Sequence, residues 1–424
     1  DRKCYRLKKI IIFVPHQDDE INLVGNILDE LVEHYSVYIV YSSLEKDSKK
    51  AEIRKKEAMN SCMLYGIEAN YIKFLGFPDT PNSSGKHYFT DGDVEIVNKI
   101  YEVIESIKPD IIIGTDFDFH SDHRMLSLAL DDALCKILKR YADYKPIYLK
   151  GFCYETAYYG VEDYSASALE NTKSKSKQLS NVSYRWEDRL SISNNHKNCF
   201  IFQQKAFKAL KCHKSQYALL HARSVINSDN VFWQKRTDNL LLNNCHITAS
   251  SGDVNKLCDL KVIDTKDIIT VDPRKIDYTK GLWIPDENDL NPIINIQFDS
   301  EMNIHQIVLH GNPMNNEVEL CNIKIIINHN IFSVEKLMPY GYPTILNVDN
   351  ISCCHMEIRL LSKTCFSEIE IFENSNNKQS LLHGNDRTNV KKSTLIDHMD
   401  IFIFNGFVLI EKIKRKIDWL RSNK

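Results

Sequence analysis

The chain has 424 residues, and because a single domain usually has about 100 to 200 residues, its length predicts at least two domains. Hydrophobic residues make up 43% of the chain and charged residues 26%, a composition that is typical of soluble globular proteins and excludes a disordered or fibrous chain. The formal net charge is -3, so the chain lacks the basic field on which non-specific nucleic-acid binding depends. We therefore expect no nucleic-acid partner.

The cysteines and the apolar runs bear on location. Twelve cysteines in a chain of this length are too dilute for a disulfide scaffold, and no Cys-x-x-Cys pair is present, so reduced thiols and a cytoplasmic protein are the expectation. Apolar runs such as 10–14 and 401–404 are far shorter than the ~20 residues that cross a bilayer. Because the sequence begins with Asp1 rather than Met, we leave open whether a leader precedes it.

Residues 8–155 alternate short apolar runs with helical patterns. We predict helices at 21–32, 49–65, 94–107 and 125–141, and strands at 10–14, 37–41, 71–77, 111–115 and 147–154. The strands lack polar alternation and are followed by helices, which predicts a Rossmann-like α/β domain, a mostly parallel sheet with helices on both faces. Ligands of such sheets bind beyond the carboxyl ends of the strands.

The next segments predict the end of the first domain and a second domain. Residues 163–199 are rich in Ser, Asn and Lys and have no clear period, which indicates either disorder or a mobile lid. Residues 202–242 return to helical spacing, and we place the first domain at 1–245. An antiparallel β-sandwich is predicted at 250–375, because short alternating runs are separated there by Asn, Gly and Pro at 293–298, 304–309, 323–327 and 356–361.

Residues 376–424 predict a C-terminal tail with a basic amphipathic helix. Four apolar residues recur there at helical spacing beside Lys and Arg, namely Ile410, Ile413, Ile417 and Leu420. Such a helix can lie on the surface of an anionic membrane, which would make the protein peripheral to that membrane. The alternative is that the apolar stripe packs against the sandwich or another subunit.

Two polar clusters directly follow two of the predicted strands. His16-Gln17-Asp18-Asp19-Glu20 follows the first strand and His120-Ser121-Asp122-His123 follows the fourth, so His and Asp side chains should meet at one crevice. Either cluster alone is typical of a helix N-terminus. Together they predict a metal site, because two His and one carboxylate are a sufficient set for catalytic zinc. The same set also holds Fe(II) in oxygenases.

These motifs resemble the PIG-L/LmbE family of zinc-dependent N-deacetylases, which act on N-acetylglucosamine-type sugars. The family pattern is a strand followed by His-Pro-Asp-Asp-Glu and, much later, His-x-x-His at the start of a helix; Gln17 stands here in place of the usual Pro. The segments 54–58, 74–79 and 211–216 also match. The resemblance extends over about residues 8 to 245.

The resemblance implies a role for each residue of the two clusters. It implies that His16, Asp19 and His123 hold the zinc, that Asp18 is the general base, and that His120 faces the developing oxyanion. Zinc lowers the pKa of bound water to about 7, so a neighbouring carboxylate can accept a proton from it near neutral pH. Asp18 or His120 would then protonate the leaving amine, and the sequence does not choose between them.

The resemblance also implies that Arg54 and Asp79 contact sugar hydroxyls. Arg54 could instead pair with Glu57 on its own helix, and Asp79 could cap the turn after Pro78. We interpret His213 as a packing residue rather than a site residue.

The strands after residue 300 resemble a discoidin or galactose-binding-like sandwich, which would either bind glycan or pack beside the first domain. The function implied is zinc-dependent removal of an N-acetyl group from an amino sugar in a glycoconjugate, a glycolipid or a precursor. One alternative is a glycan-binding protein with an inactive deacetylase-like domain. The other is a non-haem Fe(II) oxygenase, which the parallel α/β pattern disfavours.

Overall fold

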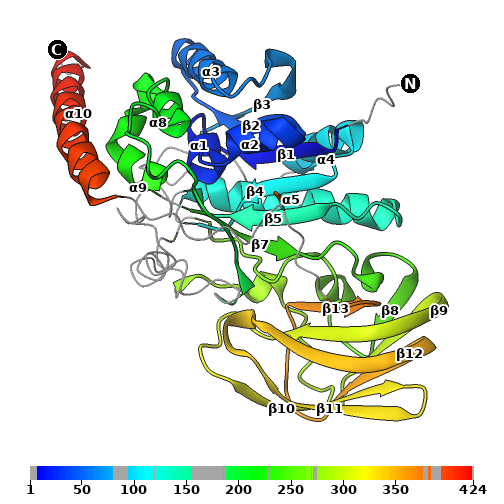
Figure 1. Ribbon diagram of the computed structural model, residues 1–424. Coiled ribbons are helices and arrows are strands. Elements are labelled where there is room, and N and C mark those ends of the chain that lie inside the picture. The colour runs from blue at the N-terminus through cyan, green and yellow to red at the C-terminus, as the bar shows by residue number, and fades with distance from the viewer. Residues whose placement is uncertain are drawn as a thin grey trace, which may run out of the picture.

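The computed structural model describes residues 7–79, 94–118, 120–153, 185, 188–227, 229–268, 270, 275–375, 381–382 and 393–422. Two sheets organise these residues, a mixed sheet in the upper body and an antiparallel sheet below it (Figure 1). We call them sheet A and sheet B. A long C-terminal helix lies along the side of the upper body, away from sheet B (Figure 1).

Sheet A has the strand order β3-β2-β1-β4-β5-β7-β6. Its strands are β1 Lys9–Val14, β2 Ser36–Leu44, β3 Ile72–Pro78, β4 Ile111–Thr115, β5 Ile147–Gly151, β6 Leu190–Ile192 and β7 Asn230–Lys235. The pairs among β1 to β5 are parallel, and β7 is antiparallel to both β5 and β6. The prediction of a mostly parallel sheet is confirmed.

Helices cover both faces of sheet A. The helices are α1 Asp19–Val24, α2 Leu28–His34, α3 Ser48–Met63, α4 Val94–Ile107, α5 Ser121–Arg140, α8 Lys205–Leu210, α9 Ala222–Asn227 and α10 Thr394–Ser422. One face of the sheet, with Ile11 and Ile112, packs on α4 and α5, and the opposite face, with Ile10 and Ile113, packs on α1, α2, α3 and α8. Because both faces of the sheet are covered at its centre, β1 and β4 are apolar and buried over nearly their whole length, as predicted, whereas β3 and β7 also contain partly exposed polar residues.

Four predictions for sheet A and its helices need correction. The helix predicted at 21–32 is interrupted between α1 and α2, where Gly25 packs closely on Ile21 and the Asn26 side chain donates to Val225 O at 2.6 Å. The helix predicted from residue 125 begins at Ser121. Helical spacing at 202–242 was misleading, because 230–235 form β7, which pairs with β5. The strand predicted at 147–154 ends at Gly151, and residue 154 lies outside the described residues.

Most of the segment predicted as a lid or a disordered stretch, 163–199, also lies outside the described residues. Its described end contains β6.

Sheet B is antiparallel, with the order β11-β10-β12-β9-β13 and β8 paired to β9. Its strands are β8 Cys245–Ala249, β9 Ile293–His310, β10 Glu319–Ile327, β11 Asn330–Leu337, β12 Pro343–Leu360 and β13 Glu368–Phe372. The runs predicted separately at 293–298 and 304–309 are one strand, β9. The register between β9 and β12 shifts near Asn347 and Cys353, and such bulges bend a strand without ending it. The boundaries placed near residues 245 and 375 stay predictions.

Polar side chains join the two sheets. Asp131 of α5 accepts from Lys150 of β5 at 2.9 Å and from Lys235 of β7 at 2.8 Å, and Lys235 also donates to Leu260 O at 2.7 Å. Before the short helical turn Leu240–Leu242, the Asn239 side chain donates to Ile369 O at 3.2 Å and accepts from the backbone N–H of Ile371 at 2.9 Å. Asn239 therefore satisfies backbone groups of β13, the outer strand of sheet B.

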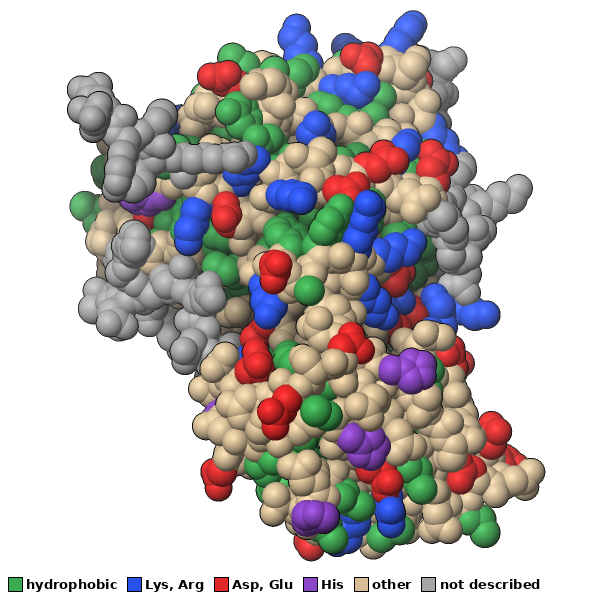
Figure 2. Space-filling view, turned by 90° about the vertical axis from the view of Figure 1, so that its right-hand side faces the viewer, with side chains coloured by type: hydrophobic (Ala, Val, Ile, Leu, Met, Phe, Trp, Pro, Cys, Tyr) green, Lys and Arg blue, Asp and Glu red, His purple; other side chains and the backbone are tan. Residues whose placement is uncertain are grey.

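The face shown in Figure 2 mixes charges of both signs, and the described cysteines form no disulfide. Figure 2 shows Lys and Arg interspersed with Asp and Glu over one face, so this face has no large field of a single sign. The described cysteines are all free, and neighbouring Cys353 and Cys354 are buried and exposed respectively. Among the described helices, none combines the length and the apolar character needed to span a bilayer.

We predict that Asp131→Asn destabilises the fold by about 3 to 5 kcal/mol, because the buried Lys150 ammonium, 1% exposed, loses its nearer carboxylate and keeps only Asp116, at 3.5 Å. Urea unfolding followed by circular dichroism measures the change in the free energy of unfolding. Asp143→Asn, at an exposed position, is the matched control and should change it by less than ~0.5 kcal/mol. Equal effects of both substitutions would contradict the role given to Asp131.

Candidate functional site

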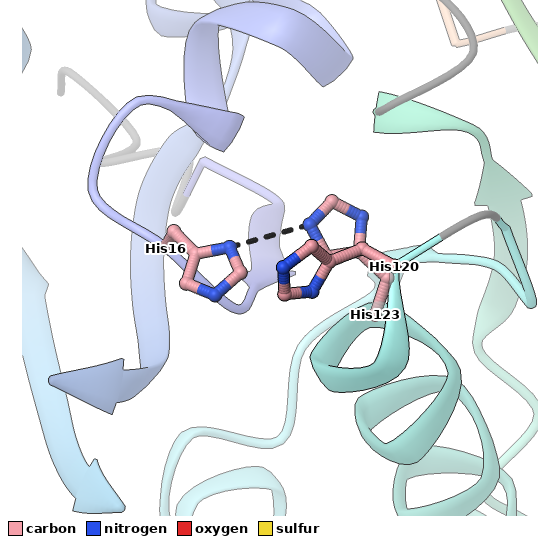
Figure 3. Close-up of side chains that lie close together, drawn as sticks. All are labelled: His16, His120 and His123. Atoms are coloured by element: carbon pink, nitrogen blue, oxygen red, sulfur yellow. Dashed lines mark hydrogen bonds between the residues drawn. The ribbon is translucent and has the colours of Figure 1, made fainter. Parts of the chain in front are cut away.

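The two polar clusters meet because β1 and β4 are parallel neighbours. Phe13 pairs with Gly114, so both strands end at the same edge of sheet A. His16 lies in the turn between β1 and α1, where the backbone N–H groups of Asp18 and Asp19 both donate to His16 O. His120 is the N-cap of α5, and His123 lies in its first turn. The three imidazoles converge from these two elements (Figure 3).

Three ligand atoms form a nearly equilateral triangle at this edge. His16 Nδ1 lies 3.1 Å from Asp19 Oδ2 and 3.3 Å from His123 Nε2, and His123 Nε2 lies 3.1 Å from Asp19 Oδ2. Tetrahedral ligands held ~2.0 to 2.1 Å from one zinc ion lie about 3.3 Å apart. The triangle therefore fits one face of a tetrahedral metal site, and its atoms belong to the three residues that the sequence predicted as ligands.

A carboxylate lies behind each of these two imidazoles. His16 Nε2 lies 2.9 Å from Asp122 Oδ2, and His123 Nδ1 lies 2.8 Å from Asp118 Oδ2. Metal-binding histidines usually donate their second ring nitrogen to such an acceptor, which orients the ring and fixes its tautomer. Sequence reasoning missed this role of Asp118 and Asp122, although both acids stand within five residues of His123.

The carboxylates around the triangle favour positive charge on its two imidazoles. Burial disfavours the charged form of His123, but Asp118 and Asp19 outweigh burial and raise the pKa of His123 to about 10. The pKa of His16 is also raised, against burial, by Asp122 and Asp19. In this form protons on the imidazoles compensate the carboxylates. A divalent ion would displace these protons, because metal ligands must be deprotonated.

His120 lies beside the triangle but is held differently. Its ring centroid is 4.8 Å from that of His16, and its Nδ1 accepts from the backbone N–H of Asp122 at 3.2 Å. Burial, with the neighbouring His16 and His123, lowers the pKa of His120 to about 3. The ring is therefore neutral and carries its proton on Nε2. Its side chain is 16% exposed, so the site opens to solvent here.

The charges of the triangle and of a second buried pair both act on the Asp18 carboxylate. Burial raises the pKa of Asp18 to about 7, with a further contribution from the Asp19 carboxylate. Within the described residues, no side chain or backbone group forms a hydrogen bond with the Asp18 carboxylate. In the second pair, His213 Nε2 lies 2.9 Å from Glu20 Oε1, which also accepts from the Ser61 hydroxyl at 2.9 Å. His213, which we interpreted as a packing residue, thus belongs to the polar surroundings of Asp18.

Arg54 and Asp79 come together near the site. Arg54 Nη1 donates to Asp79 Oδ2 at 2.6 Å, and Arg54 Nη2 donates to Gln216 Oε1. A carboxylate oxygen of Asp79 lies within 4.8 Å of ligand atoms of His16 and Asp122. The alternative pairing of Arg54 with Glu57 does not occur, since Glu57 accepts from Ser215 instead. The sequence did not predict a site role for Gln216, although the segment 211–216 matches the family pattern.

Weak structural similarity links the chain to several solved structures. N,N'-diacetylchitobiose deacetylase from Pyrococcus horikoshii is 15% identical with a TM-score of 0.32, and the match covers 54% of this chain and 84% of that one. The hydratase GalB from Pseudomonas putida is 14% identical with a TM-score of 0.27, and the match covers 34% of this chain and 65% of that one, less than two thirds. A family 32 carbohydrate-binding module from Clostridium perfringens NanJ is 12% identical with a TM-score of 0.21, covering 30% and 93%. No curated protein matches the sequence.

A family model matches part of the chain. It is PIG-L, described as GlcNAc-PI de-N-acetylase, and it matches residues 11–134, less than a third of the chain. This range contains the triangle, the two carboxylates behind it, and every residue to which we gave a site role from the sequence. Residues 11–134 are therefore a PIG-L family domain.

Proposed function

We propose that the protein is a metal-dependent hydrolase that removes an N-acetyl group from an amino sugar in a glycoconjugate, a glycolipid or a precursor of these. Zinc is the metal that we expect. The observation that carries the proposal is the triangle of His16, Asp19 and His123, with a carboxylate on the second nitrogen of each imidazole. The PIG-L domain supports the choice of an N-acetyl group as the target.

His16, Asp19 and His123 would hold the metal by one face, which leaves the opposite side for water and substrate. A divalent ion there supplies Lewis-acid polarisation of the carbonyl and acidifies water. Asp118 and Asp122 hold the two imidazoles so that His123 Nε2 and His16 Nδ1 face the Asp19 carboxylate, where the three atoms would hold the ion.

Asp18 is the residue that we assign as general base. Its carboxylate adjoins the ligand Asp19 in sequence and is free of hydrogen bonds from the described residues, so it can accept a proton from the attacking water. The water oxygen then bonds to the acetyl carbon. When the carbon–nitrogen bond breaks, Asp18 returns the proton to the amine, and acetate and the free amino sugar are the products.

His120 stabilises the oxygen that becomes negative in this step. Because its Nδ1 accepts from the Asp122 N–H, Nε2–H is the donor that can point at the acetyl oxygen. A protonated His120 would place Nδ1–H against the Asp122 N–H, so His120 is poorly suited to deliver the proton to the amine. For this reason the proposal gives proton delivery to Asp18, a choice between Asp18 and His120 that the sequence left open.

Arg54 and Asp79 are the proposed contacts to sugar hydroxyls. Their side chains are 12% and 20% exposed, and Asp79 lies close to His16. A charged pair of this kind offers both donors and acceptors to a hydroxyl.

The test of the proposed function is acetate release from a panel of N-acetylated amino sugars, nucleotide sugars and lipid-linked saccharides. We expect release that a chelator abolishes and that added zinc restores. Elemental analysis of the purified protein separates zinc from iron, and iron with oxygen consumption would support the oxygenase alternative. Zinc in the site without release from any substrate would support the glycan-binding alternative.

We predict that Asp18→Asn retains the metal but lowers kcat by roughly 10² to 10⁴-fold, because an amide cannot accept the proton from water. Steady-state rates and elemental analysis of the same preparation measure both quantities. A variant with nearly unchanged kcat would show that Asp18 is not the general base.

We predict that Asp118→Asn weakens metal affinity by roughly 10 to 100-fold, because the amide is a poorer partner for His123 Nδ1 than the carboxylate. Competition with a chromophoric chelator measures this affinity. His16→Ala is the reference for loss of a ligand, and Asp143→Asn is the surface control. Affinity equal to that of the control would refute the supporting role of Asp118.

A further inference from the structure

The helix α10 has two opposite faces of different character. One face packs on the upper body, beside α8 and α9 (Figure 1): Phe404 is buried, Asp400 accepts from the backbone N–H of Ile201 at 3.0 Å, and Phe407 contacts Phe207 with ring centroids 5.7 Å apart. Further along, Asp418 accepts from the Tyr217 hydroxyl at 3.0 Å. The body thus covers one side of the helix as far as Glu411, whereas residues 412–421 are all exposed and contact the body through Tyr217.

The opposite face is apolar and exposed. Its residues recur at intervals of three, four or seven, which keeps them on one side of an α-helix. Each of them is at least 41% exposed, and they are Leu395, Met399, Phe402, Leu409, Ile413, Ile417 and Leu420. We call this set the outer stripe. The alternative that the stripe predicted from the sequence packs on the sandwich is therefore wrong.

The charges of α10 are segregated with respect to the outer stripe. All four acids of the helix share the spacing of the buried Phe404 and so lie on the side that faces the body; they are Asp397, Asp400, Glu411 and Asp418. Lys412, Lys416 and Arg421 each lie one or four residues from a member of the outer stripe, at its borders. The two other basic residues of this stretch lie away from the outer stripe: Lys414 pairs with Glu411 at 2.8 Å, and Arg415 lies 6.0 Å from the centroid of the Tyr217 ring.

From this segregation we propose that the outer stripe docks on the surface of an anionic lipid membrane, with α10 lying in the plane of the interface. Apolar side chains would enter the acyl boundary while lysines and arginines at the borders reach the headgroups. A second copy of the chain fits the stripe less well. If two α10 helices paired in parallel, the basic borders of one would face the basic borders of the other. If they paired antiparallel, the basic borders of one would face the first half of the other, whose acids point toward its own body and offer no partner.

The test is flotation of the full chain with vesicles. With vesicles containing phosphatidylserine, we expect roughly tenfold more bound protein than with phosphatidylcholine alone. Binding should fall when salt is raised from ~0.05 to ~0.5 M, because salt screens the attraction. No binding to anionic vesicles at low salt would overturn the proposal.

Substitutions in the outer stripe test whether α10 is responsible for binding to vesicles. The triple variant Phe402→Ser, Leu409→Ser, Ile413→Ser should lose binding without a change in thermal unfolding, because these side chains face solvent. Its matched control replaces exposed apolar residues of sheet B and its loops, Leu290→Ser, Leu320→Ser and Ile331→Ser, and should bind like the unmodified chain. Equal binding by both variants would overturn the proposal.

The charged borders have their own pair of variants. Lys412→Gln, Lys416→Gln, Arg421→Gln should weaken binding to anionic vesicles, whereas the control Lys49→Gln, Lys50→Gln, Lys336→Gln should not. Sedimentation velocity without lipid tests whether a second copy of the chain covers the outer stripe instead. A dimer that the triple serine variant of α10 dissociates would show that a second copy covers the outer stripe, and the membrane assignment would then be wrong.

Discussion

The parallel pairing of β1 with β4 is the constraint on which the site depends. Phe13 and Gly114 are partners, and each stands one residue before its strand ends, so the loops that follow leave the sheet at the same level. Gly114 also lets α5 lie close to β4, because a Cβ there would come 2.4 Å from the Leu130 side chain. A shift of one residue in this register would move His123 by ~3.3 Å relative to His16 and break the triangle.

The segment between β8 and β9 supports this arrangement through Arg124. Arg124, which is fully buried, donates from Nε to Asp118 O and from Nη1 to Thr270 O at 2.6 Å. Its guanidinium also lies 5.0 Å from the centroid of Phe117. Asp118 in turn orients His123. The position of one candidate ligand thus depends on a segment almost 150 residues further along the chain, which gives the second half of the protein a part in the geometry of the first.

The sequence predicted what local patterns encode and missed what distant contacts decide. The strand at 10–14 matches β1 to within one residue, because a strand buried on both faces is a continuous apolar run. The strand β7 was missed because its residues continue the helical spacing of 202–242, and only its pairing with β5, some 80 residues earlier in the chain, makes it a strand. The two clusters were recognised from residue types, whereas the contact between Asp118 and His123 needs the turn before α5. For α10 the apolar residues were predicted but not the direction in which they face.

The contact between Asn239 and β13 has a consequence for the second half of the chain. An outer strand offers unpaired N–H and C=O groups to any other extended chain, and such edges favour aggregation. The side-chain amide of Asn239 forms hydrogen bonds with these backbone groups at Ile369 and Ile371, as a neighbouring strand would. A fragment that begins after Asn239 would lose these hydrogen bonds, and the backbone groups of β13 would be available to another chain. The segment that precedes sheet B therefore protects its outer strand from association with other chains.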